Sequence, residues 1–204
     1  MKNNYDKLMQ AQIKSVVESG KKPKLLLHAC CAPCSTACLE RVIEFFDVTV
    51  YFYNPNITSQ IEYDKRLLEI KNFLQNAYNG NVNLIYEDYN ANEFLNAVKG
   101  YETEPEGGKR CKICYALRLD KTANYAKNNG FDYFTTTLSV SPHKNAEWLN
   151  ELGVLISKKY NVNYLYADFK KQGGYLRSIQ LSKEYNLNRQ DYCGCDYSIN
   201  KKNP

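Results

Sequence analysis

The 204-residue chain lacks the glycine-rich loops with which many enzymes bind nucleotide phosphates, because neither GxxxxGK[ST] nor GxGxxG occurs in it. This absence disfavours an enzyme that holds a nucleoside triphosphate in such a loop. The chain also lacks any apolar run approaching the roughly 20 residues of a membrane span, and its first residues lack the apolar stretch of a secretory signal. We therefore expect a cytoplasmic protein with no membrane partner.

A large excess of one sign of charge is also missing, since the net charge is only +5. This balance is compatible with an anionic partner such as nucleic acid but does not require one. Histidine is scarce, and His28 and His143 are each open to two interpretations. A core or surface-loop histidine is the commoner outcome, and a direct role in the chemistry is the alternative.

Cysteine, by contrast, is abundant, with eight residues in the chain. In a reducing compartment these do not form a disulfide framework, and their close spacing indicates metal binding or redox chemistry instead. Cys38 stands apart, and we interpret it as a small apolar core residue. The other seven form three groups: Cys30, Cys31 and Cys34; Cys111 and Cys114; and Cys193 and Cys195.

The first group follows the apolar run Leu25-Leu26-Leu27, which predicts a strand, and precedes a helix with Pro33 near its first turn. Soft thiolates in this position favour zinc, Cu(I) or an iron–sulfur cluster. Because adjacent residues of an extended segment point to opposite faces, we expect Cys30 and Cys31 to serve different centres.

The spacing of the second and third cysteine groups leaves their chemical role more open than that of the first group. Cys111-x-x-Cys114 stands at a predicted helix start with Arg118 on the same face, and both the helix N-terminus and the positive charge favour thiolates. Cys193-Gly194-Cys195 is too tight for easy bidentate ligation, although the glycine relaxes the backbone. It supplies one ligand, a redox-active pair or a second metal centre, and its spacing does not choose between them.

Predicted strands alternate with predicted helices, which indicates an α/β fold with a parallel sheet of about five strands, joined by right-handed crossovers and flanked by helices. After the first strand we expect strands at 48–53, 82–86, 131–138 and 164–167, and helices at 36–46, 59–78, 93–98, 113–128, 148–160 and 175–185. The length favours one domain. Its parts are an N-terminal helix and linker (1–22), a parallel-sheet core (23–170) and a cysteine-rich C-terminal helix and segment (171–204).

Four separated sequence blocks are HACCAPC at 28–34, RCKICYALRL at 110–119, TTLSVSPHK at 136–144 and RQDYCGC at 189–195. In this order, within residues 24–198, they resemble the QueH-type epoxyqueuosine reductases. The resemblance implies a Rossmann-like α/β fold related to the adenine-nucleotide α-hydrolase group, without the ATP loop of that group. It also implies the last step of queuosine synthesis, in which the epoxide of epoxyqueuosine at the wobble position of tRNA is reduced.

The same resemblance implies a [4Fe-4S] cluster with an adjacent mononuclear iron. Carried over onto this chain, the cluster ligands are Cys31, Cys34, Cys111 and Cys114, and the residues near the second iron are Cys30, Cys193 and Cys195. Some members of the family have aspartate where this chain has Cys34, so the fourth cluster ligand varies. The electron donor is not identified by any motif.

Reducing an epoxide to an alkene takes two electrons and two protons, so a proton donor must reach the departing oxygen. Our candidates are Asp191, Tyr192 and His143. For the tRNA, we expect Lys144, Arg177 and Arg189 to bind phosphates and Tyr53 or Tyr192 to stack on a base.

Two other functions fit parts of the pattern. The thiolates could close a structural zinc site in a nucleic-acid-binding module without catalytic activity. Alternatively, Cys111-x-x-Cys114 alone could serve a dithiol oxidoreductase that needs no metal, although seven cysteines in three groups exceed what that chemistry requires. Metal analysis separates all three.

Overall fold

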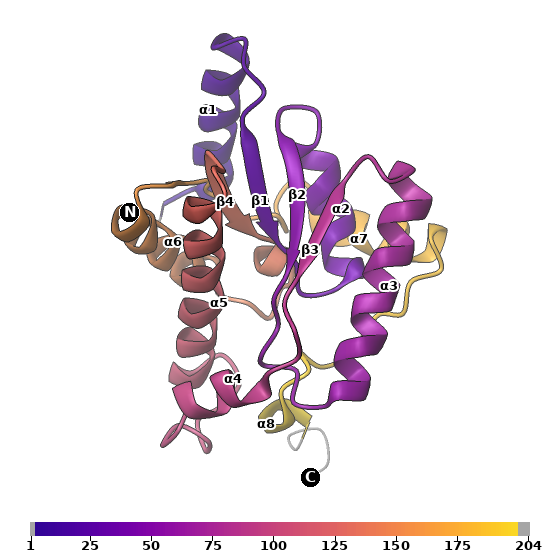
Figure 1. Ribbon diagram of the computed structural model, residues 1–204, viewed down its shortest axis with the longest axis vertical. Coiled ribbons are helices and arrows are strands. Elements are labelled where there is room, and N and C mark those ends of the chain that lie inside the picture. The colour runs from indigo at the N-terminus through magenta and orange to yellow at the C-terminus, as the bar shows by residue number, and fades with distance from the viewer. Residues whose placement is uncertain (1–2, 200–204) are drawn as a thin grey trace.

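The computed structural model describes residues 3–199 and contains a five-stranded parallel sheet between two layers of helices (Figure 1). The strand order is β3-β2-β1-β4-β5, so β1 occupies the centre of the sheet. The predicted α/β class is therefore confirmed. The strands are β1 (Lys24–His28), β2 (Asp47–Phe52), β3 (Asn83–Tyr86), β4 (Tyr133–Thr136) and β5 (Asn163–Tyr164).

The central strand is apolar on both sides because helices cover both faces of the sheet. Leu25 and Leu27 pack into the core on one face, whereas Leu26, which alternates with them, packs into the core on the other. β1 pairs with β2 and β4 in parallel, and Leu26 lies between Thr49 and Phe134 in the register. The burial of these leucines contributes strongly to fixing the register of the central strands, because a shift by one residue would move each leucine to the opposite face of the sheet.

The helices divide between the two faces (Figure 1). Helices α1, α2 and α3 contribute to the core that contains Leu25, while α5 and α6 contribute to the core that contains Leu26. Helix α7 packs on α2, and α4 packs on α5. The helices are α1 (Tyr5–Glu18), α2 (Ala32–Val42), α3 (Gln60–Tyr78), α4 (Ala91–Ala97), α5 (Lys109–Asn128), α6 (Ala146–Tyr160), α7 (Gly174–Glu184) and α8 (Asp196–Ile199), with a short 3₁₀ helix, η1 (Thr137–Val140).

Two boundaries and one additional helix differ from the sequence prediction in ways that shape the site. Helix α2 begins at Ala32 rather than at 36, because Cys31 is its extended N-cap residue and Pro33 fits its first turn. The fourth strand ends at Thr136 rather than at 138, because the Thr136 hydroxyl accepts from the Leu138 amide and the chain turns into η1. Helix α8, directly after Cys195, was not predicted.

The first two residues of the predicted segment 1–22 and the last five of the predicted segment 171–204 lie outside the described residues. The described parts of both segments contain the expected helices, α1 and α7. Among residues 3–199, none of the helices combines the length and the apolar character needed to span a bilayer.

Candidate metal centre

A cavity of about 460 Å³ opens at the carboxyl end of the sheet, where the chain leaves β1 and β4 in opposite directions. From β1 the chain enters α2 on one face of the sheet, and from β4 it passes through η1 to α6 on the other face. Neighbouring parallel strands whose connections diverge in this way leave a crevice between them, the usual ligand site of open α/β sheets. All seven grouped cysteines line this cavity.

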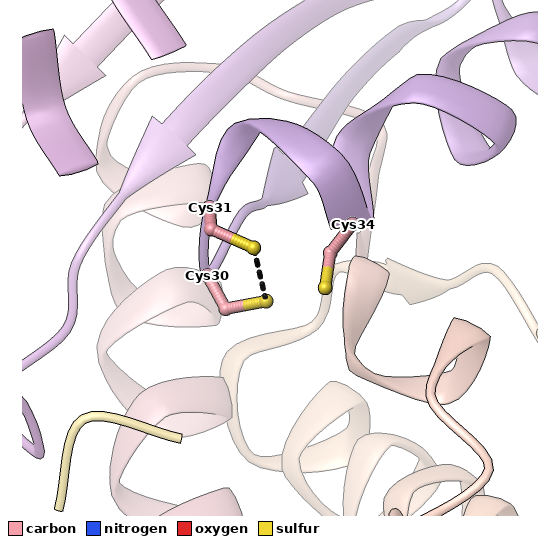
Figure 2. Close-up of side chains that lie close together, drawn as sticks. All are labelled: Cys30, Cys31 and Cys34. Carbon is pink, nitrogen blue, oxygen red and sulfur yellow. Dashed lines mark hydrogen bonds between the residues drawn. The ribbon is translucent and has the colours of Figure 1, made fainter. Parts of the chain in front are cut away.

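Three of these cysteines form a compact triad between β1 and the first turn of α2. The sulfur atoms of Cys30, Cys31 and Cys34 all lie within 4.8 Å of one another, and the Cys30 and Cys31 sulfurs are 3.8 Å apart. Figure 2 shows the three side chains turned toward the same space. The expectation that Cys30 and Cys31 point to opposite faces is therefore wrong. Strand β1 ends at His28, and strand alternation does not extend through the turn to Cys31.

The triad behaves as one acidic unit. Hydrogen bonds from the Cys31 and Cys34 thiols hold the pKa of Cys30 well below its usual range, and the nearby Arg118 guanidinium acts in the same direction against burial. The pKa values of Cys31 and Cys34 are raised, first because each is hydrogen-bonded to the Cys30 sulfur. Three neighbouring thiols, one of which ionises more readily than an ordinary cysteine, are a suitable soft site for a metal that displaces the remaining protons.

The other four cysteines come from α5 and from the segment before α8. Cys111 lies in the first turn of α5, where its sulfur accepts from the Gly107 amide at 3.2 Å. Cys114 and Cys195 are buried in an apolar cluster with Phe94. In the structure, Cys30 thus lies with Cys31 and Cys34. The ligand assignment that the family resemblance implies instead groups Cys30 with Cys193 and Cys195, near the second iron. Cys38 is fully buried and lies outside the cavity lining, as expected of a core residue.

The Cys193-Gly194-Cys195 segment is held by the loop after β2. The Asn56 amide donates to the Cys193 carbonyl at 2.9 Å, and the Thr58 amide donates to the Gly194 carbonyl at 3.1 Å. Gly194 has φ +91°, and a Cβ there would lie 2.8 Å from the Ile57 side chain. Glycine is therefore required at this position both for its backbone conformation and for the close approach.

Behind the thiols, a buried hydrogen-bond network fixes the floor of the site. Arg118 donates from Nε to His28 Nε2 at 3.2 Å and from Nη2 to the side-chain oxygen of Asn54. His28 Nδ1 lies 2.8 Å from the Thr136 hydroxyl. Burial, reinforced by the Arg118 charge, lowers the pKa of His28 to about 3. His28 is therefore a neutral framework residue and lies outside the cavity lining.

The predicted proton donors Asp191, Tyr192 and His143 all line the cavity. The Tyr192 ring lies 5.3 Å from the Arg66 guanidinium carbon, in a cation–π contact. Burial is the main cause that raises the pKa of Tyr192, and Arg66 opposes it. A phenol that keeps its proton at neutral pH beside a cation is a suitable hydrogen-bond donor.

The four predicted substrate-binding residues separate into two pairs. Lys144 and Arg189 line the cavity. The Lys144 side chain is only 10% exposed and lies 3.2 Å from the Glu106 carboxylate. The Arg189 guanidinium donates to the Ser178 and Ser182 hydroxyls.

Tyr53 and Arg177 lie outside the lining. Tyr53 is 4% exposed, stacks on Tyr51 and donates to Glu93, so its ring offers no open face for a base. Arg177 is paired with Glu40 through two hydrogen bonds of 2.9 and 2.6 Å. In this conformation neither position suits contact with a nucleotide that enters the cavity.

Several lining residues were not identified from the sequence, and the polar, buried ones among them include Arg66, Asn56 and Tyr115. A signal for Arg66 was available. The buried face of α3 contains Tyr63, Arg66, Ile70 and Phe73 at spacings of three and four, so the arginine occupies a core position of the helix. A charged residue on an apolar face indicates a partner or a ligand.

Comparison with known proteins agrees with this geometry. Residues 25–201 match the family model described as epoxyqueuosine reductase QueH. Curated proteins named epoxyqueuosine reductase QueH from Streptococcus pyogenes serotype M1, Staphylococcus epidermidis and Thermotoga maritima are 46%, 42% and 38% identical to the chain. The alignments cover 97%, 99% and 86% of this chain and 78%, 88% and 90% of those proteins. The chain belongs to the epoxyqueuosine reductase QueH family.

Proposed function

We propose that this chain reduces the epoxide of epoxyqueuosine in tRNA to give queuosine, the activity that the names of its relatives state for them. The observation that carries the proposal is the cavity at the sheet edge, into which three separate segments bring seven cysteines. A dithiol reductase would need only two of them. The tRNA substrate is consistent with the net charge of +5 and with the predicted cytoplasmic location.

The donor set fits iron–sulfur chemistry. All seven candidate ligands are soft sulfur donors in one cavity, and three already lie within 4.8 Å of one another. We therefore infer that Cys30, Cys31 and Cys34 provide ligands to one and the same metal centre. The remaining ligands come from Cys111, Cys114, Cys193 and Cys195, and the seven thiolates together hold a [4Fe-4S] cluster and an adjacent iron. When bound, such a group supplies electrons one at a time and a Lewis acid for oxygen.

The residues of the chain have three further tasks, namely to hold the nucleotide, to exclude water and to deliver protons. Arg189 and Lys144 present cations in the cavity, where they would contact the nucleotide itself rather than distant phosphates. Tyr192, Asp191 and His143 are the groups that could deliver protons there. An electron donor completes the reaction, since the chain must receive two electrons for each epoxide.

The test is to prepare the protein anaerobically, measure iron and acid-labile sulfide, and add tRNA that contains epoxyqueuosine with a chemical reductant. We expect brown protein, and mass spectrometry of the digested tRNA should detect queuosine. Colourless protein that carries stoichiometric zinc after anaerobic reconstitution, with no turnover, would support the zinc-stabilised nucleic-acid-binding module instead.

A further inference from the structure

Arg66 brings a buried guanidinium to the wall of the cavity from the middle of α3. Its side chain is 3% exposed, and its guanidinium carbon lies 5.3 Å from the centre of the Tyr192 ring. Its Nε donates to the Glu62 carboxylate at 2.7 Å, one helical turn earlier. One ion pair and one aromatic contact therefore hold the plane of the guanidinium in a fixed orientation.

The Nη2 atom of Arg66 is buried and has no hydrogen-bond partner among residues 3–199. A buried charged N–H group without a partner is rare in folded proteins, because its loss of water is not compensated. Two further buried polar atoms of the cavity lining, Asn56 Oδ1 and Tyr115 Oη, also lack a partner within the described part of the chain. These residues therefore offer unpaired donors and an unpaired acceptor, which a ligand that carries both acceptor oxygens and hydroxyl or amine groups would satisfy.

The position of Arg66 is not explained by the packing of α3 alone. Its neighbours on the buried face of the helix, Tyr63 and Ile70, are residues that a core position normally holds. Glu62 uses the Nε edge of the guanidinium, which leaves Nη2 for a different acceptor. Arg66 and the thiol triad line the same cavity, so a substrate held at the thiols would lie beside the Arg66 side chain.

We propose that Arg66 is a catalytic residue whose Nη2 donates a hydrogen bond to the epoxide oxygen of the substrate and stabilises the negative charge that develops on it. The proposal rests on the proposed function. In the reaction, two electrons from the reductant break both C–O bonds and form the C=C bond, and the oxygen takes up two protons and leaves as water. Arg66 supplies neither proton, because a guanidinium does not deprotonate in proteins.

This role needs a cation that stays charged and a donor whose direction is fixed. Arginine provides both, whereas lysine provides only the charge. Tyr192, whose ring contacts the Arg66 guanidinium, is one of the three lining residues that could deliver a proton in the same cavity. In this arrangement Arg66 stabilises charge, and a separate residue delivers the protons.

The test compares wild-type protein with the variants Arg66→Ala and Arg66→Lys in single turnover, with enzyme in excess over tRNA that contains epoxyqueuosine. We expect Arg66→Ala to lower the rate of queuosine formation by about 100-fold, the usual effect of losing one donor to a developing oxyanion. Arg66→Lys should be intermediate. Millimolar guanidinium should restore part of the rate of Arg66→Ala, and methylammonium should restore less. The matched control is Lys65→Gln, which removes a cation from an exposed position of the same helix and should react like wild type.

Three other measurements identify the cause of any loss. Iron and sulfide content, bleaching of the absorbance by dithionite, and tRNA affinity should match wild type in Arg66→Ala. A normal rate in Arg66→Ala, or a loss of rate that accompanies a loss of iron or of bleaching, would overturn the assignment, because Arg66 would then be dispensable or structural. Absence of turnover by iron-loaded wild-type protein would instead overturn the proposed function itself.

Discussion

The triad of Cys30, Cys31 and Cys34 and the Cys193-Gly194-Cys195 segment bring thiols to the same cavity by different means. The triad is part of the turn between the central strand and α2, so the packing of the sheet holds it. The C-terminal segment has irregular backbone and is held by hydrogen bonds to the 56–58 loop, by the close approach of Gly194 to Ile57 and by the packing of Cys195 against Phe94.

The comparison indicates a division between a preformed half and an assembled half of the site. The sulfur atoms of the triad lie close together on one turn of the chain, which lowers the entropic cost of binding a metal there. The C-terminal segment depends on a few local contacts, so its docking can be removed without disturbing the sheet. The predictions below test this division, beginning with the largest expected effect.

Replacing Cys31 by serine should abolish iron binding and lower the rate of queuosine formation by more than about 100-fold, beyond the losses known for outer-shell changes at metal sites. Cys31 is the N-cap residue of α2 and one corner of the triad. Iron analysis and the visible absorbance measure the effect.

The control is Cys38→Ser, the same chemical change one helical turn beyond Cys34. Cys38 donates to the Cys34 carbonyl at 3.1 Å and a serine hydroxyl can replace it in that hydrogen bond, so iron content should be retained. Equal iron loss in both variants would show that the fold of α2, and not ligation, is what matters.

Replacing Gly194 by alanine should undock the C-terminal segment while leaving the triad in place. The substitution meets the side chain of Ile57 at 2.8 Å and adds about 1–2 kcal/mol for a residue with a Cβ in a left-handed conformation. We expect a lower iron content and faster tryptic cleavage near Arg189.

Gly130→Ala is the matched control for Gly194→Ala. Gly130 has φ +69°, nothing within 4 Å of its added Cβ and no place in the cavity lining, so that variant carries the backbone strain without the clash. Comparable proteolysis of the C-terminal segment in both variants would count against its docking on Ile57.

The smallest effect is expected for Ser198→Ala. The Ser198 hydroxyl donates to the Cys195 carbonyl at 2.7 Å and lies 3.3 Å from the Cys193 sulfur. Losing it should cost about 1 kcal/mol, which lowers the midpoint of thermal unfolding by about 2–4 °C. The iron content should also fall slightly.

Ser157→Ala removes a similar hydrogen bond, to the Val154 carbonyl at 2.9 Å in α6. It should lower the unfolding temperature by no more than Ser198→Ala does, because alanine is the better helix former, and it should leave the iron content unchanged. If both variants lose iron equally, Ser198 has no special part in the assembled half of the site.

Much of the fold follows from local patterns. The alternation of apolar strands and amphipathic helices predicts the α/β class, and Pro33 predicts a helix directly after the cysteine turn. Pairing order does not follow from such patterns. The neighbours of β1 are β2 and β4, and only the three-dimensional packing of the crossovers decides this order.

The site was predicted in part. Spacing identifies the grouped cysteines. It could not predict that the Cys30 and Cys31 sulfur atoms lie side by side, because the direction of these side chains depends on where β1 ends. Tyr53 follows β2 in the sequence near the site, yet its ring turns into the core around Tyr51. The place of Arg66 on the apolar face of α3 indicates a partner or a ligand, but Arg66 lies far from every cysteine in the sequence. Only the packing of α3 reveals that it reaches the cavity.

The separation between the two halves of the site along the chain has a consequence during synthesis. Roughly 160 residues are translated between the triad and Cys193, which takes on the order of ten seconds at about 5–20 residues per second. During this interval the nascent chain displays three clustered thiols whose covering segment does not yet exist. We therefore expect those thiols to be more accessible to oxidants and to competing metals in the nascent chain than in the complete protein.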